Sequence, residues 1–145
     1  MKTTTMRLMT IASILFLSFT ACDDEKVVGE NALPKAASLY ITEHFPSHKV
    51  IQVVKERDDM KTTYDVFLDE GYRLEFSKKG DILGVEGNSK LPDSVIPPAI
   101  LSYVQTNYPN EHILDWELDD IGQDVTLSNR MELKFDKNGN FLRID

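Results

Sequence analysis

The feature that most constrains the fold is an internal repeat, in which segment 33–46 aligns with segment 96–109 at an offset of 63 residues. The identical positions are Pro34, Ala36, Tyr40 and Pro46 in the first segment and Pro97, Ala99, Tyr103 and Pro109 in the second. The alignment resumes after a deletion of four residues, with 65–83 matching 124–142. Because the matched residues are mostly prolines, glycines and apolar positions, we interpret the repeat as a repeated structural plan.

Each repeat begins with a predicted helix. Pro34 and Pro97 suit the first turn of a helix, where a missing N–H costs little. Apolar side chains then recur at helical spacing over 34–44 and 97–107, which predicts a helix in each range. A second proline follows two residues later in both segments and ends the helix, because the residue before a proline avoids the helical region.

Alternating side chains predict the strands that follow. In 64–69 and 72–76, apolar and polar residues alternate, which is typical of a strand with one buried and one solvated face. Glu70-Gly71 predicts a hairpin turn between these two strands. The other predicted strands are 50–54, 82–85, 113–116 and 141–144, with turns at 79–80 and 138–139.

These elements predict an α+β fold. We expect a tandem repeat in which each unit is a helix followed by a four-stranded antiparallel meander. The two repeats span 32–88 and 91–145, and because neither is large, we expect their two sheets to join or to pack as one domain over 32–145. Residues 22–31 are polar and charged and are expected to form a flexible acidic tether.

The spacing of these residues is similar to that of a known family. The positions that carry the similarity are Leu33, Pro34, Tyr40, Ile41, Phe45, Pro46, Tyr64, Val66, Leu68, Gly71, Leu74, Phe76 and Gly80. The chain resembles the PepSY-like, beta-lactamase-inhibitor-like family of bacterial envelope proteins over about residues 32–145. The second repeat departs from the pattern at Asn129-Arg130. The resemblance implies the tandem architecture of the beta-lactamase inhibitor proteins. Its motifs are structural, so they indicate the fold and say little about activity. Because the family as a whole has no established activity, the resemblance implies a binding role rather than an enzyme.

The first 22 residues predict a lipoprotein signal peptide. Lys2 and Arg7 precede an apolar run over 8–19 that is too short to span a bilayer. The run leads into Phe19-Thr20-Ala21-Cys22, so we expect residues 1–21 to be removed and Cys22 to be lipidated. Two or three acyl chains would anchor the protein firmly. An ordinary secretory signal with a chance cysteine is the alternative.

The predicted location is the bacterial cell envelope, with the lipid anchor as the only contact with the membrane. Asp23, Asp24 and Glu25 directly follow the expected lipidation site. Lipoprotein sorting systems read such acids in opposite ways, as retention at the inner membrane or as export to the cell surface. We expect the outer membrane, with the domain facing the periplasm or exposed at the surface.

Charge and cysteine content exclude several classes of partner and site. Removal of 1–21 takes away Lys2 and Arg7 and no acid, so the net charge changes from −8 to −10. An acidic domain is repelled by phosphate backbones, and we expect no nucleic-acid partner. Cys22 is the only cysteine, so no thiol remains for a disulfide or a thiolate metal site.

No motif predicts catalysis, a cofactor or a metal site. His44 and His48 are spaced to hold zinc on a helix, but Pro46 breaks the helix between them. The segment 136–140 resembles a calcium loop that lacks the final glutamate, and a hairpin turn explains it. A further acidic cluster allows weak cation binding or an ordinary solvated loop; it consists of Asp115, Glu117, Asp119, Asp120 and Asp124.

The solvated side of the sheet is the candidate ligand surface. Phe67 falls among charged residues on the polar side of its strand, which is typical of an interaction patch, although single exposed aromatics are also common. Trp116, the only tryptophan, aligns with Val53 and is expected in the core. The candidate ligand-binding residues are Asp65, Phe67, Arg73, Glu75, Asp124, Thr126, Glu132 and Lys134.

Two hypotheses for function follow. The first is a lipid-anchored, inhibitor-like envelope module that binds a protein or peptide through this surface. The second is a structural or accessory subunit of a surface lipoprotein complex, which an exposed apolar edge would favour.

Overall fold

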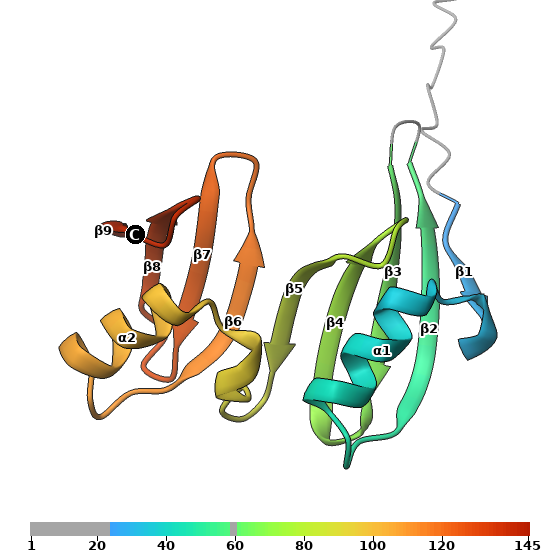
Figure 1. Cartoon of the computed structure of the whole chain (residues 1–145), viewed down its shortest axis with the longest axis horizontal. Coiled ribbons are helices and arrows are strands. Elements are labelled where there is room, and N and C mark those ends of the chain that lie inside the picture. The colour runs from blue at the N-terminus through green and yellow to red at the C-terminus, as the bar shows by residue number, and fades with distance from the viewer. Residues whose placement is uncertain (1–23, 59–60) are drawn as a thin grey trace, which may run out of the picture.

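The computed structural model describes residues 24–58 and 61–145, and it contains one antiparallel sheet of nine strands in the order β1 to β9 (Figure 1). Every strand pairs with its neighbour in the sequence, so the sheet is a continuous meander. The strands are β1 (Lys26–Val28), β2 (Val50–Arg57), β3 (Thr62–Leu68), β4 (Tyr72–Ser77), β5 (Ile82–Gly87), β6 (Ile113–Leu118), β7 (Gly122–Leu127), β8 (Glu132–Asp136) and β9 (Phe141–Ile144).

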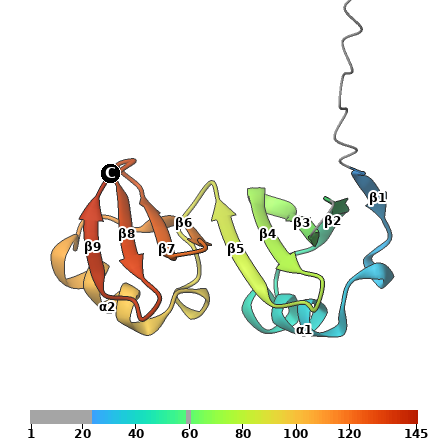
Figure 2. The ribbon, with the colours of Figure 1, turned by 90° about the horizontal axis from the view of Figure 1, so that it is seen from above.

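Two helices, α1 (Lys35–His44) and α2 (Pro98–Asn107), lie on the same face of the sheet, as Figure 2 shows from above. Both predicted helices are confirmed to within one residue. Each ends as expected just before a proline, and the backbone N–H of the next residue, Phe45 or Tyr108, bonds back to the helix. Neither helix among the described residues has the length and apolar character needed to cross a membrane.

The core lies between the helices and a row of side chains that crosses seven strands. The cross-strand register aligns Val53, Val66, Leu74, Val85, Trp116, Val125 and Leu133. Each of these side chains is at most 4% exposed, and burying one contributes roughly 1.5–3 kcal/mol. The expected core position of Trp116 is confirmed.

The helices are fixed to the sheet by edge-on aromatic contacts. Tyr40 of α1 meets Phe76 of β4 with ring centroids 5.7 Å apart, and Tyr103 of α2 meets Phe135 of β8 at 5.5 Å. Such edge-to-face pairs are favourable because the positive edge of one ring meets the negative face of the other.

Two turns between strands press against the helices. Gly80 has φ 91°, and a Cβ at this position would lie 2.8 Å from the backbone N of Ala37 in α1. Gly139 has φ 81°, and its Cβ would lie 3.0 Å from that of Ala99 in α2. Only glycine meets both requirements at such a turn, a left-handed backbone and close contact with a helix.

The predicted fold class is wrong. The structure is mostly β, a single nine-stranded sheet with two helices, and not a tandem pair of helix-led four-stranded meanders. Direct pairing of β5 with β6 joins the parts, through the register Gly84↔Glu117, Val85↔Trp116 and Glu86↔Asp115. Side-chain alternation predicts where strands are, but pairing depends on backbone hydrogen bonds between edges, which leave little trace in the sequence.

The sheet also has a strand in the range predicted as a flexible tether, 22–31. Residues 26–28 form β1, which pairs with β2, and residues 30–32 form a short 3₁₀ turn. Asp24 already pairs with Arg57, since each backbone N–H donates to the other carbonyl, at 3.1 and 3.2 Å. The predicted signal peptide and Cys22 lie outside the described residues.

Candidate functional site

Figure 2 shows that the helices leave the other face of the sheet uncovered, and we call it the open face. It carries the polar side chains of the strands. Successive side chains of a strand point to opposite faces, so the neighbours of the buried row lie here. The register aligns Asp65, Glu75, Gly84, Glu117, Asp124 and Lys134 across six strands. A second row holds Phe67, Arg73, Glu86, Asp115, Thr126 and Glu132.

All eight predicted ligand residues lie on the open face, but in two groups. Asp65, Phe67, Arg73 and Glu75 belong to β3 and β4, whereas Asp124, Thr126, Glu132 and Lys134 belong to β7 and β8. Strands β5 and β6 separate the groups. Their role in binding stays a prediction.

The first group is organised by an ion pair between a buried carboxylate, Asp65, and a half-exposed guanidinium, Arg73. Arg73 donates from Nε and Nη2 to the two carboxylate oxygens of Asp65, each at 3.1 Å, in the fork geometry that suits guanidinium and carboxylate. Asp65 is only 4% exposed, and this hydrogen bond raises the pKa of Arg73. Phe67 lies beside the pair and lines a depression of about 430 Å³ with Arg73, Glu56 and other residues.

Four carboxylates surround the exposed side of Arg73, and we call them the acidic seam: Glu75, Glu86, Asp115 and Glu117. They come from β4, β5 and β6 and line a hollow of about 90 Å³, where Gly84 leaves the space between strands unfilled. Of these four carboxylates, Glu86 alone forms an ion pair with Arg73 among the described residues, at 4.0 Å. Negative charge therefore exceeds positive charge at the centre of the open face.

Crowding of these acids changes their protonation. Burial raises the pKa of Asp115 to about 6, and the neighbouring Glu86 and Glu117 add to the effect. Burial also raises the pKa of Glu75, with a contribution from Asp65. Like charges held together in a partly buried site disfavour ionisation, so the seam is electrostatically strained at neutral pH.

The second group is more nearly neutralised. Lys134 forms a close ion pair with Asp124 and lies 3.8 Å from Asp145. The hydrogen bond to Asp124 raises the pKa of Lys134. Thr126 and Glu132 are paired across β7 and β8 and flank this ion pair. Lys134 therefore supplies this group with its own cation. The acidic seam has only Arg73, which is already bonded to Asp65.

The centre of the site could not be predicted from the sequence. Glu86 is absent from the predicted ligand residues. The sequence places Asp115 and Glu117 in an acidic cluster with Asp119, Asp120 and Asp124, either a weak cation site or a solvated loop, and not in the ligand surface. In the structure, Asp115 and Glu117 lie on β6 and face the seam, whereas Asp119 and Asp120 lie in the β6–β7 turn. The alternation Asp115-x-Glu117 was the available signal, but the β5–β6 pairing that brings in Glu86 was not predicted.

The candidate metal residues have other partners. His44 Nδ1 lies 2.9 Å from Ser94 Oγ, and His48 Nδ1 lies 3.0 Å from Asp69 Oδ1. Asp136 accepts hydrogen bonds from the backbone of 138 and 140 and so closes a hairpin turn. Within 24–58 and 61–145, no three histidine, cysteine or acidic residues are arranged to hold a metal ion.

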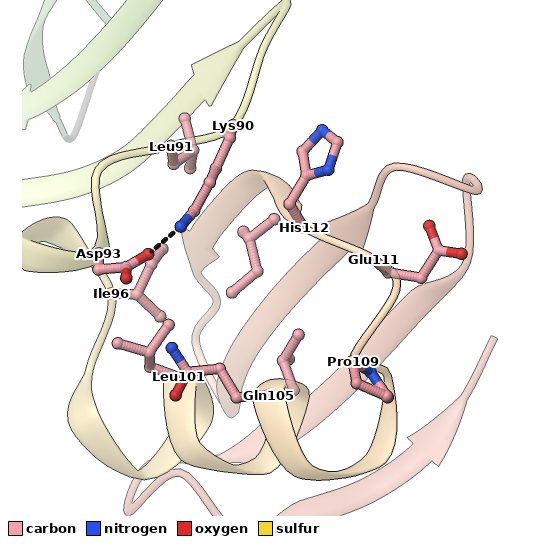
Figure 3. Close-up of a pocket in the computed structure, with 11 residues that line it drawn as sticks. Lys90, Leu91, Asp93, Ile96, Leu101, Gln105, Pro109, Glu111 and His112 are labelled. Atoms are coloured by element: carbon pink, nitrogen blue, oxygen red, sulfur yellow. Dashed lines mark ion pairs between the residues drawn. The ribbon is translucent and has the colours of Figure 1, made fainter.

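A second hollow lies beside α2, away from the open face (Figure 3). It has a volume of about 340 Å³, and its floor is apolar, with Leu91, Ile96, Val104 and Ile113. An ion pair between Lys90 and Asp93, at 2.9 Å, lies on its rim. Gln105, Glu111 and His112 also line the hollow, and Figure 3 shows them at separate positions around it.

Comparisons with known proteins agree with this fold. A crystal structure from Bacteroides vulgatus, described as a "putative periplasmic protein", is 42% identical, covers 86% of this chain and 98% of that chain, and has a TM-score of 0.81. A protein from Bacteroides thetaiotaomicron, described as a "putative calcium-regulated periplasmic protein", is 38% identical over 83% of this chain and 96% of that chain, with a TM-score of 0.80. A second Bacteroides vulgatus structure, "of unknown function", is 36% identical over 84% of this chain and 99% of that chain, with a TM-score of 0.79.

All three relatives are described as periplasmic, which supports an envelope location for this chain. No curated protein matches it. A family profile described as "Putative beta-lactamase-inhibitor-like, PepSY-like" matches the chain twice, over residues 19–84 and 62–143. These two matches together span most of the sequence, and the chain therefore belongs to the PepSY-like, beta-lactamase-inhibitor-like family.

Proposed function

We propose that the protein is a binding module of the bacterial envelope, anchored by lipid at Cys22, and that its open face binds a basic segment of a protein or peptide. The observation that carries the proposal is the acidic seam, in which four carboxylates share one guanidinium that is already bonded to Asp65. A lysine or arginine side chain placed there would relieve their mutual repulsion.

The form of the site favours a peptide over a metal ion. The seam is a shallow groove that crosses three strands and continues into the depression beside Phe67, so it offers an extended surface. One relative is described as calcium-regulated, which makes calcium the competing ligand. The absence of a metal-holding group among the described residues favours the larger cationic ligand.

Titration calorimetry of the mature protein with a lysine-rich peptide tests the proposal. We expect binding that weakens as salt is added, because partly exposed charges are screened. The double substitution Glu75→Gln and Asp115→Asn should weaken binding by about tenfold. A matched control, Glu30→Gln with Asp120→Asn, removes the same charge at exposed positions away from the seam and should bind like the parent.

Two results would contradict the proposal. Equal loss of affinity in the seam variant and the control would reduce the effect to net charge. Saturable calcium binding that is abolished by the seam substitutions, without peptide binding, would identify a cation site instead. Inhibition of an envelope enzyme is the form of binding that the family description suggests, and a captured basic partner can be assayed for it.

One feature favours the second candidate function, a subunit of a surface complex. Strand β9 ends the sheet, and Leu142 and Ile144 on it are 55% and 50% exposed. An apolar edge strand is a template for adding another strand. If this function holds, Ile144→Lys will release the protein from an envelope complex seen by native electrophoresis, whereas the seam variant will remain in it.

A further inference from the structure

We propose that one end of the sheet rests on the surface of the lipid bilayer, through the turn that joins β6 to β7 and beside the end of β2, where Asp24 leads back to the anchor. The inference deepens the proposed function, because it rests on the lipid anchor at Cys22. It replaces a domain held away from the membrane with one seated on it in a fixed orientation.

The chain between the anchor and the fold is short. Asp24 is held by two backbone hydrogen bonds to Arg57, at the end of β2. Only two peptide units separate Asp24 from Cys22, and two residues span at most about 7 Å. The paired Asp24 and Arg57 lie a further ~5.5 Å apart. The end of β2 at Arg57 is thus within reach of the headgroups whenever Cys22 is acylated.

The topology of the sheet places the β6–β7 turn at the same end as the end of β2. In a continuous antiparallel meander, β2 and β6 run in the same direction, so the end of β2 and the turn that follows β6 lie at the same end of the sheet. Figure 1 shows the end of β2 and the β6–β7 turn at the upper edge of the sheet. The β7–β8 turn lies at the opposite end, because β7 has six residues and separates the two turns by about 20 Å.

The β6–β7 turn exposes apolar side chains. Ile121 is 76% exposed, the most exposed large apolar side chain among the described residues, and Leu118 beside it is 42% exposed. Apolar side chains at a protruding turn gain free energy when they enter the boundary of headgroups and acyl chains. Together with the anchor, they would give the domain two separate points of contact.

The charges at this end indicate which lipid surface fits. Arg57 and Lys61 lie on the β2–β3 hairpin, whereas Asp119 and Asp120 lie in the β6–β7 turn. This mixture, on a strongly acidic protein, suits zwitterionic headgroups better than anionic ones. The expected surface is therefore a bilayer rich in zwitterionic lipid.

Site-specific labelling of the lipidated protein tests the inference. The full chain is expressed with its own N-terminal segment and inserted into phosphatidylcholine vesicles that contain a spin-labelled lipid. Cys22 is the only natural cysteine and is consumed by the lipid, so one introduced cysteine accepts an environment-sensitive dye. Ile121→Cys reports the proposed contact, and Asn129→Cys, in the β7–β8 turn, is the matched control.

We expect a blue shift and severalfold stronger quenching at position 121 than at position 129. Equal, weak quenching at both positions would overturn the inference and leave a domain that stands away from the bilayer. Leu118→Cys provides a second reporter if Ile121→Cys perturbs folding, which circular dichroism would reveal. Addition of anionic lipid should weaken the signal at position 121.

The outcomes separate this inference from the proposed function. Absence of acyl chains by mass spectrometry, with loss of the protein from the vesicles, would refute the anchor and the inference together. An acylated protein without quenching at position 121 would refute only the seated orientation. Peptide binding by the acidic seam is judged separately by calorimetry and is unaffected by either result.

Discussion

At the scale of single residues, the open face combines a charge that is well compensated with several that are not. Asp65 is buried but bonded twice to Arg73, so its charge is satisfied. Asp115 is half-buried among like charges, and its pKa rises to about 6. The two carboxylates should therefore respond in opposite ways to substitution.

Asp115→Asn should stabilise the protein at neutral pH. A carboxyl whose folded pKa is raised binds its proton more tightly in the folded state, so stability falls as pH rises from about 4 to about 6 and the penalty is complete above that range. Removing the charge should recover on the order of 1 kcal/mol at pH 7.5, after allowance for screening by water.

Urea unfolding at pH 7.5 and pH 4.0 measures this effect. The gain should disappear at pH 4.0, where Asp115 is protonated in the folded parent. Asp120→Asn, at an exposed turn position, should change little at either pH. An equal gain at both pH values would show that the aspartate is unfavourable for a reason other than charge.

Arg73→Met should destabilise the protein, because it leaves the Asp65 carboxylate buried without its partner. Breaking such a pair from one side costs about 3 kcal/mol. Arg143→Met is the matched control: its pair with Asp145 is exposed, with side-chain exposures of 60% and 38%, so the loss should stay below about 1 kcal/mol. Both losses are read from denaturant unfolding. Asp65→Asn added to Arg73→Met should restore part of the stability, and failure to do so would assign the loss to packing.

At the scale of elements, helices and strands could be predicted from the sequence because their signals are local. Both helices were predicted from the prolines at 34 and 97 and from the period of the apolar residues. Strands β3 and β4 were predicted from the alternation of apolar and polar residues. Strand β1 was missed because three residues, Lys26–Val28, are too few to show a period. The β5–β6 pairing was missed because it is set by edges far apart in the chain, and the acidic seam was missed with it.

Gly80→Ala tests the fit between a turn and helix α1. The substituted residue must keep φ near 91°, which costs about 1–2 kcal/mol, and its Cβ would clash with the α1 backbone. The loss of stability in thermal unfolding should therefore exceed that of Gly29→Ala. Gly29 has φ −72°, and its added Cβ meets only the end of the Asn31 side chain. Equal losses would show that the turn can move away from the helix.

At the scale of the whole molecule, the continuous sheet makes a single cooperative unit the expected behaviour. The buried row runs without interruption from β2 to β8, and Trp116 lies within it against Val85. A defect introduced in one part of the row should be felt throughout.

Leu74→Ala measures this cooperativity. Leu74 is fully buried on β4, and its truncation should cost about 2–5 kcal/mol. The fluorescence of Trp116, on β6, should shift its urea midpoint by the same amount as circular dichroism. A fluorescence midpoint that stays at the parent value would show that the two parts of the sheet unfold independently.

The pairing of β5 with β6 has one further consequence. The acidic seam draws its carboxylates from β4, β5 and β6, so it straddles this junction. A ligand bound there would stabilise the pairing of β5 with β6, because it contacts all the carboxylates only while these strands are paired. By mass action, each tenfold rise in ligand concentration above the dissociation constant would stabilise the paired state by about 1.4 kcal/mol more.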